Sequence, residues 1–320
     1  MLDTLTQDDL NLLVEVAWLY YEQELTQAEI GRRINVSRST VSRLLQEART
    51  SGIVTVTINY SIARDAELED RLRTAFDLQH VRVLRSLGRP KEVVRRGMGQ
   101  LAARLLEQYV TDECVVGVSY GLSIADTIAQ VNPAHHFNVT VIPIIGALGS
   151  NNPLIEGIDL ARELAMKFGA RYRYLHAPLL VEDPRTRDLL VQEPSVRDVL
   201  AEGARADCVI IGIGALEPDS SSLIWTGYLN ENELEGLRNK GAVGHMCAQF
   251  FDDRGQVLDI DLNQRAISIG LSALHDVNTV IAVAGTREKA SAILGALRGG
   301  YVDVLVTDDQ AAAGILELSR

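Results

Sequence analysis

Six short apolar runs recur between residues 114 and 308, and each is followed by a stretch that can form a helix. Continuous apolar runs of this length are typical of strands that are buried on both faces. Strands that alternate with helices favour a parallel sheet covered by helices on both sides, with ligand-binding loops beyond the carboxyl ends of the strands. The runs are CVVGVS (114–119), VTVIPII (139–145), RYRYLHA (171–177), CVIIGIG (208–214), NTVIAVAG (278–285) and VDVLVTD (302–308).

Composition limits the class of protein. A chain of 320 residues suits a small module joined to a larger one, and its 47% hydrophobic content can fill a sizeable core. The first residues, MLDTLTQDDL, lack the features of a signal peptide, and no apolar run approaches a membrane span. We therefore expect a cytoplasmic protein. Cys114, Cys208 and Cys247 lie far apart, so neither a disulfide framework nor a metal site is expected, and no cofactor.

A basic block near the start contrasts with the formal net charge of -12 for the whole chain. Residues 31–50 contain five arginines and a single acidic residue, Glu47. Positive charge concentrated on one short element of an acidic protein is the pattern expected where arginines contact phosphates and base edges of DNA. An ordinary three-helix subdomain with a solvated basic face remains the alternative.

Local signals divide this region into three helices. The first is predicted to end near Leu25 and to bury an apolar face. Thr26 and Glu29 form a capping box that starts a second helix at Gln27. Ser37 is the N-cap of a third helix, which extends to about Thr50. The predicted face of the first helix consists of Leu10, Leu13, Val14, Ala17 and Trp18.

The second and third helices with their short turn match the helix-turn-helix pattern, in which the later helix enters the major groove. The alternating sequence IVTVTIN (53–59) is predicted to form a small wing. A helix follows, with Leu68, Leu72 and Phe76 on one face; that face could contact a second subunit or pack within its own. The DNA contacts are predicted at the start of the recognition helix, from Arg38, Ser39, Thr40, Ser42 and Arg43.

The first apolar run leads into the loop GVSYGLS (117–123), which allows two functional interpretations. Gly117-x-Ser119-x-Gly121 matches the nucleophile elbow of hydrolases, for which His275 and Asp259 are candidate partners. The same loop could instead hold a phosphate with its backbone N–H groups and a helix N-terminus. A tight turn that merely needs glycine is the third possibility.

A second loop favours the phosphate. Thr286, Arg287 and Lys289 follow another strand and begin another helix. Cations at a helix start are unfavourable next to the helix dipole unless an anion lies between. Two such loops at one sheet edge favour a phosphorylated ligand over an ester substrate.

Five segments in order along the chain show a family resemblance. The sequence resembles the SorC/DeoR-type sugar-phosphate-sensing bacterial transcription regulators, and the nearest subgroup contains regulators of autoinducer-2 uptake and of polyols and pentoses. The matching segments are VAWLYYEQELTQAEIGRRINVSRSTVSRLLQEARTSGIVTVTIN (16–59), LQHVRV (78–83), GVSYGLSIADTI (117–128), NKGAVGHMCAQFFDDRGQV (239–257) and AGTREKASAILGALRGGYVDVLVTDDQAAAGIL (284–316).

The resemblance implies a winged helix-turn-helix domain (1–59) and a Rossmann-like effector domain (60–320) related to sugar-phosphate isomerases but without their catalysis. It also implies homo-oligomers, usually tetramers, whose affinity for operator DNA changes when a phosphorylated sugar, polyol or related metabolite binds. The expected protein is a repressor of a carbohydrate or polyol operon. An isomerase or hydrolase fused to a DNA-binding module, and a constitutive DNA-binding protein, are the alternatives.

One position departs from the family pattern. Relatives typically carry an acid where this chain has His245, and a neutral imidazole offers a ligand one donor and one acceptor instead of a carboxylate. Glu156, Asp159 and Gln249 are further polar candidates. The effector-binding residues are predicted to be Ser119, Tyr120, Gly121, Leu122, Ser123, His245 and Lys289.

Overall fold

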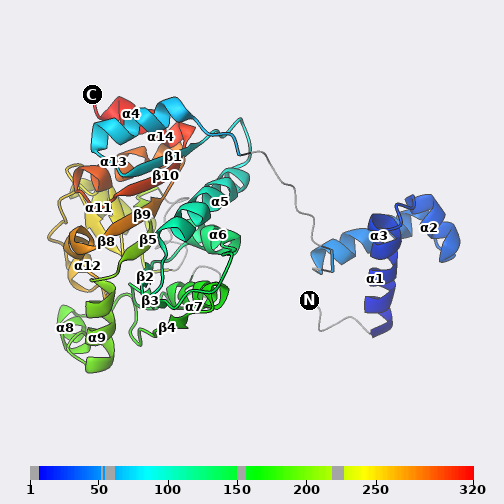
Figure 1. The fold of residues 1–320 in the computed structure, drawn as a ribbon, viewed down its shortest axis with the longest axis horizontal. Helices are drawn as coiled ribbons and strands as arrows, with labels where there is room; N and C mark the ends of the chain where they lie inside the picture. The colour runs from blue at the N-terminus through cyan, green and yellow to red at the C-terminus, as the bar shows by residue number, and fades with distance from the viewer. Residues whose placement is uncertain (1–6, 52, 55–61, 150–155, 218–226) are drawn as a thin grey trace. The chain divides into compact units, whose positions relative to one another are not determined.

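The computed structural model describes residues 7–51, 53–54, 62–149, 156–217 and 227–320 (Figure 1). The chain divides into two compact units, residues 1–61 and residues 62–320. The predicted wing strand (53–59) lies almost entirely outside the described residues. Among the described helices, none is both long and apolar enough to cross a membrane.

The N-terminal unit contains the three predicted helices, α1 (Gln7–Tyr21), α2 (Gln27–Arg33) and α3 (Arg38–Thr50). The predicted apolar face of α1 was wrong at two positions, because Val14 and Trp18 are 52% and 50% exposed. The buried face of α1 is rotated toward Leu13, Val16, Ala17 and Leu19, which pack with Ile30, Val41, Leu45 and Ala48 of the other helices.

Both predicted helix starts are confirmed. The Thr26 backbone N–H donates to Glu29 Oε2 at 2.9 Å, and the Glu29 N–H donates back to Thr26 Oγ1. The Thr40 N–H donates to Ser37 Oγ at 3.1 Å at the start of α3. Between the two helices, Asn35 takes a left-handed conformation with φ of 56°, which asparagine tolerates better than most residues. These contacts fix the turn that orients α3 against α2.

The larger unit is built on a seven-stranded, all-parallel sheet in the order β1-β10-β9-β5-β2-β3-β4. The parallel sheet predicted from the apolar runs is therefore confirmed. The strands are β1 (His80–Leu84), β2 (Val115–Val118), β3 (Thr140–Pro143), β4 (Arg171–Tyr172), β5 (Cys208–Gly212), β9 (Thr279–Val283) and β10 (Val304–Asp308).

Helices cover both faces of this sheet (Figure 1). α5, α6 and α7 pack on one face, and α4, α13 and α14 pack on the other. Successive residues of β5 belong alternately to the two cores, with Ile210 in the first and Ile211 in the second. The helices are α4 (Ala66–Phe76), α5 (Lys91–Tyr109), α6 (Leu122–Gln130), α7 (Gly157–Phe168), α8 (Pro184–Leu190), α9 (Pro194–Gly203), α11 (Glu231–Asn239), α12 (Asp261–Gln264), α13 (Ala290–Arg298), α14 (Asp309–Leu318) and the short 3₁₀ helices η4 (Leu271–Asp276) and η5 (Arg287–Lys289).

Two details differ from the sequence prediction. The run 171–177 forms only the two-residue strand β4, because it lies at the sheet edge and pairs with β3 alone. A small antiparallel sheet of β6 (Gly214–Ala215), β7 (Gly244–Met246) and β8 (Gln249–Phe251) was not predicted. Its strands are too short for their periodicity to be recognised.

The apolar face of α4 packs within its own subunit. Leu72 is fully buried, and Leu68 and Phe76 pack partly buried against the same core as α14. Of the two roles left open for this helix, the structure shows the intramolecular one.

Candidate DNA-recognition helix and effector pocket

The predicted DNA contacts lie at the start of α3. Arg38, Ser39, Ser42 and Arg43 are exposed, whereas Val41 faces the core. The side chains that would meet DNA are therefore separated from those that hold the helix in place. This amphipathic division is the one that a recognition helix requires.

The hydroxyl groups of this segment already interact with one another. Ser37 Oγ lies 2.8 Å from Ser39 Oγ and 2.8 Å from Thr40 Oγ1. Thr40 is half-buried and belongs to the helix cap, so Arg38, Ser42 and Arg43 are the more accessible groups. Arg49 has a structural contact, because its Nε donates to the Tyr21 hydroxyl at 2.9 Å.

In the larger unit, a cavity of about 310 Å³ opens beyond the carboxyl ends of β2, β5 and β9. After β2 the chain adds β3 and β4 toward one edge of the sheet, and after β5 it adds β9 and β10 toward the other edge. Ligands of doubly wound α/β proteins bind at such a switch point. Of the predicted effector residues, the cavity wall contains Tyr120, Gly121, Leu122, Ser123, His245 and Lys289.

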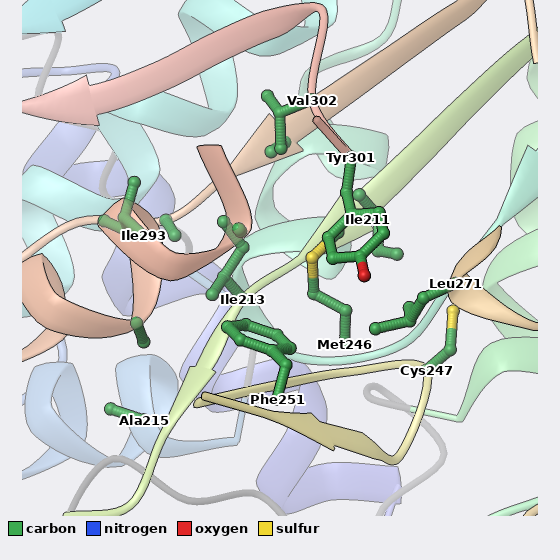
Figure 2. Packing of buried hydrophobic residues seen from close by; sticks show 14 of the residues in the cluster. Ile211, Ile213, Ala215, Met246, Cys247, Phe251, Leu271, Ile293, Tyr301 and Val302 are labelled. Carbon is green, nitrogen blue, oxygen red and sulfur yellow. The ribbon is translucent and has the colours of Figure 1, made fainter. Parts of the chain in front are cut away.

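One wall of the cavity comes from the small sheet and the segment after β5. His245, Met246 and Cys247 line it together with Ile213 and Gly214. Figure 2 shows the apolar packing around this wall, where Ile213, Met246 and Phe251 lie together in the core. This apolar core therefore supports the side of the wall that faces away from the cavity, while the wall itself contributes His245 to the cavity lining.

The loop after β2 presents the start of α6 to the cavity. Gly121 has φ of 110°, a conformation that favours glycine, and no described side chain caps the helix. Uncapped N–H groups and the helix dipole make such a start suitable for an anion. Gly121, Leu122 and Ser123 all line the cavity at this point.

Lys289 lies on another wall of the same cavity. Its Nζ donates to the Ile213 carbonyl oxygen at 3.0 Å. Burial, reinforced by Arg95 and opposed by Asp308, lowers the pKa of Lys289 to about 8. A cation held where it is poorly solvated is an unfavourable arrangement that a bound anion would relieve.

The neighbouring cation that the sequence grouped with Lys289 has a different partner. Arg287 pairs with Glu317 of α14 and is not among the residues that line the cavity. The expectation that an anion must compensate every cation of this loop was therefore wrong for Arg287, because a carboxylate distant in sequence already does so. Thr286 lines the cavity, and its backbone N–H donates to Asp308 Oδ2 at 2.6 Å.

His245 lies on β7, and its side chain is packed into the cavity wall. It is 3% exposed, and within the described part of the chain its Nε2 has no hydrogen-bond partner. Burial, together with the Lys289 ammonium, lowers the pKa of His245 to about 3, so the imidazole is neutral at physiological pH. Only a glycine fits at position 214, since a Cβ there would lie 2.1 Å from His245 Nε2.

Ser119 does not join the other predicted residues at the cavity. It is 1% exposed, and its backbone N–H donates to the Ile210 carbonyl oxygen within the sheet. The candidate hydrolase partners interact elsewhere: His275 Nε2 lies 2.9 Å from the Gly299 carbonyl oxygen, and Asp259 accepts from Gln264. The described geometry therefore offers no nucleophile elbow.

Sequence reasoning missed the wall formed by α5. Lys91, Val94, Arg95 and Met98 line the cavity at the spacing of one helix face. The spacing of Lys91 and Arg95 was visible in the sequence, but nothing there indicated that this helix crosses the cavity. Glu156 and Gln249 do not line the cavity. The Glu156 carboxylate accepts a hydrogen bond from the Leu148 N–H, and the Gln249 side-chain oxygen accepts one from the Leu271 N–H.

A helix-turn-helix unit joined to a parallel α/β domain with an anion-suited pocket defines the class of ligand-responsive transcription regulators. Comparison with known families supports both parts. Residues 60–317 match the family model described as "Putative sugar-binding domain", and residues 1–51 match the model of sigma-70, region 4. The chain belongs to the sugar-binding family of SorC-type transcriptional regulators.

Individual relatives agree along nearly the whole chain. The sorbitol operon regulator of Klebsiella pneumoniae is 30% identical over 314 residues, which are 97% of this chain and 99% of the relative. The transcriptional regulator LsrR of Escherichia coli O9:H4 is 34% identical over 307 residues, 95% of this chain and 94% of the relative. The crystal structure of full-length SorC from Klebsiella pneumoniae matches with a TM-score of 0.73 and 29% identity, covering 97% of this chain and 100% of that one. These relatives are regulators and not enzymes, and the chain is a ligand-responsive DNA-binding regulator.

Proposed function

We propose that the cavity binds the phosphate end of a phosphorylated sugar, polyol or related metabolite, and that binding controls the affinity of α3 for operator DNA. The observation that carries this proposal is the pairing of two features across one cavity. The uncapped start of α6 supplies N–H donors, and Lys289 supplies a poorly solvated ammonium group. An anion between them would be stabilised by charge-assisted hydrogen bonds.

The remaining walls suit the uncharged part of such a ligand. His245 offers a neutral imidazole, which can donate to or accept from a hydroxyl group but adds no charge. Met98 and Met246 supply apolar surface. A volume of about 310 Å³ suits a small metabolite, at the lower end of common ligand pockets.

The DNA-binding half of the proposal rests on Arg38, Ser42 and Arg43, with Ser39 and Thr40 as further contacts. A single recognition helix reads only a few base pairs, so specific binding requires paired half-sites and a homodimer or tetramer. We assign the protein to the cytoplasm, where its operator lies, as a repressor of a carbohydrate or polyol operon.

A thermal-shift screen tests the ligand class. The full-length protein is heated with phosphorylated sugars and polyols and, in parallel, with their unphosphorylated forms, and each mixture is then analysed for product. We expect stabilisation by a phosphorylated compound without its conversion, because a ligand that binds only the folded state raises the melting temperature. Product formation would support an enzyme, and equal stabilisation by both forms would contradict a phosphate site.

A further inference from the structure

A third wall of the cavity comes from α5, outside the two loops that suggest a phosphate site. Lys91, Arg95 and Met98 lie one helical turn apart along one side of this helix, and all three line the cavity. With Lys289, the lining contains three cationic side chains and one acidic side chain, Glu92, so its formal charge is more positive than Lys289 alone provides. Of the two α5 cations that line the cavity, Lys91 is the more exposed, at 68% of its side chain, and its Nζ pairs with Glu288.

Arg95 is held in a defined position. Its Nε donates to Asp126 Oδ2 on α6, and the two side chains are only 26% and 19% exposed. Among the described residues no hydrogen bond engages the Nη1 or Nη2 groups of Arg95. One edge of the guanidinium thus fixes it in place, while its Nη groups have no hydrogen-bond partner within the part of the chain that the structure describes.

The packing of α5 on α6 restricts movement of this arginine. One turn after Arg95, the two helix backbones touch at Gly99, where a Cβ would lie 2.8 Å from the Asp126 carbonyl oxygen. On α6, the Thr127 hydroxyl donates to the Ser123 carbonyl oxygen at 2.7 Å, next to the loop that lines the cavity. The Arg95 guanidinium is therefore anchored to the same helix whose start lines the cavity, and a donor that is already held in place loses less entropy when a ligand binds.

We propose that Arg95 is a second cationic ligand of the anion site and binds the same phosphate group as Lys289 and the start of α6. The proposal rests on the proposed function and assigns a specificity role to a residue of α5. Arg95 and Lys289 line one cavity, and among the described residues no hydrogen bond joins either of them to Glu92, the acidic residue that also lines it. The electrostatic effect of Arg95 on Lys289 agrees with their proximity. A planar guanidinium with two available N–H groups matches two phosphate oxygens, a geometry that a lysine cannot reproduce.

The chemical class of the effector follows from this arrangement. Two cations and a helix N-terminus favour a doubly charged phosphate monoester over a singly charged carboxylate or sulfate ester. The regulator should therefore discriminate between compounds of the same size by the charge of their anionic group.

Calorimetric titration of the full-length protein with inorganic phosphate tests the role of Arg95. We expect Arg95→Gln to weaken phosphate binding at least about 10-fold, and Arg95→Lys to weaken it about 3-fold or more, because lysine retains the charge but not the paired donors. Arg96→Gln is the matched control, since Arg96 is the next residue on α5 but is exposed and does not line the cavity. Its phosphate affinity should equal that of the wild type.

The possible outcomes separate the two proposals. If the wild-type protein and Arg96→Gln bind phosphate and Arg95→Gln binds it equally well, the role of Arg95 is refuted while the phosphate pocket stands. If the wild-type protein binds neither inorganic phosphate nor any phosphorylated sugar, the pocket itself is refuted. If Arg95→Gln does not fold, Arg95→Lys decides, and an affinity equal to that of the wild type overturns the proposal.

Discussion

Replacing Lys289 by methionine should stabilise the ligand-free protein and abolish its response to a phosphorylated effector. The Lys289 ammonium is poorly solvated and lies among charged or titratable groups from three elements, Arg95 on α5, His245 on β7 and Asp308 on β10. Methionine fills a similar volume without a charge. The residue proposed to bind the effector is thus expected to lower the stability of the domain that carries it.

The magnitude follows from the pKa of Lys289, which falls from 10.5 to about 8. Each pKa unit corresponds to about 1.4 kcal/mol, so the buried charge lowers the free energy of unfolding by about 3 kcal/mol at neutral pH. The substitution also removes the hydrogen bond to the Ile213 carbonyl, which contributes about 1 kcal/mol. The net gain of about 2 kcal/mol should raise the melting temperature by about 4 to 8 °C.

The pH dependence identifies the cause of this gain. Between about pH 8 and pH 10.5 the unfolded chain binds a proton at Lys289 that the folded protein has released. The stability of the wild type therefore rises relative to the variant as the pH increases through this window, because the destabilising charge is fully present below the window and absent above it. At high pH only the missing hydrogen bond should distinguish the two proteins.

Thermal unfolding at about pH 7 and about pH 10 measures both effects. Lys240→Met is the control, because Lys240 is exposed at the end of α11 and should change stability by no more than about 0.5 kcal/mol. A variant at position 289 that is less stable than the wild type at neutral pH, or that still responds to phosphorylated effector, would refute the reasoning.

Three further predictions concern DNA binding, packing and assembly. Arg38→Ala and Arg43→Ala should each weaken operator binding by about 1 to 3 kcal/mol without affecting folding; wild-type affinity of both variants in a fluorescence-anisotropy titration would exclude them from the interface. Gly99→Ala should destabilise the protein by about 1 to 3 kcal/mol, because its Cβ would meet the Asp126 backbone at 2.8 Å, and an unchanged melting temperature would contradict this close contact. Light scattering at micromolar concentration should show a dimer or larger oligomer, and a strict monomer with and without DNA would disprove the proposed assembly.

Local signals in the sequence were sufficient for the elements that depend on near neighbours. The capping box of Thr26 and Glu29 and the N-cap at Ser37 identify helix starts from contacts between residues only three positions apart. The apolar runs likewise predict the parallel strands, because burial on both faces leaves a pattern within each strand. The boundaries of the recognition helix were therefore predictable before the structure.

Features that depend on distant segments were not predictable. Arg287 resembles Lys289 in the sequence, yet it faces Glu317, thirty residues later. Arg95 lines the cavity through the packing of α5 on α6, whose close approach at Gly99 depends on a segment more than twenty residues away in the sequence. Trp18 follows helical periodicity but lies on the exposed side of α1, since spacing alone does not determine which of two overlapping apolar faces is buried.

The central claim is that recognition of a phosphate in the pocket changes the affinity of the recognition helix for DNA. A ligand can shift this equilibrium only if it binds one state of the oligomer more tightly than the other. The most direct test measures the operator affinity of the wild type at increasing concentrations of the effector found by screening and, separately, of its dephosphorylated form. The same titration with the phosphorylated effector is then repeated for Lys289→Met.

For the wild type, we expect operator affinity to respond to the phosphorylated effector at a concentration at least about 100-fold lower than to the dephosphorylated form, because charge-assisted contacts contribute about 1.5 to 3 kcal/mol each. Lys289→Met should bind the operator but show no response, with circular dichroism confirming that it is folded. An equal response to both forms of the effector, or a Lys289→Met variant that responds at the same concentration as the wild type, would contradict the central claim.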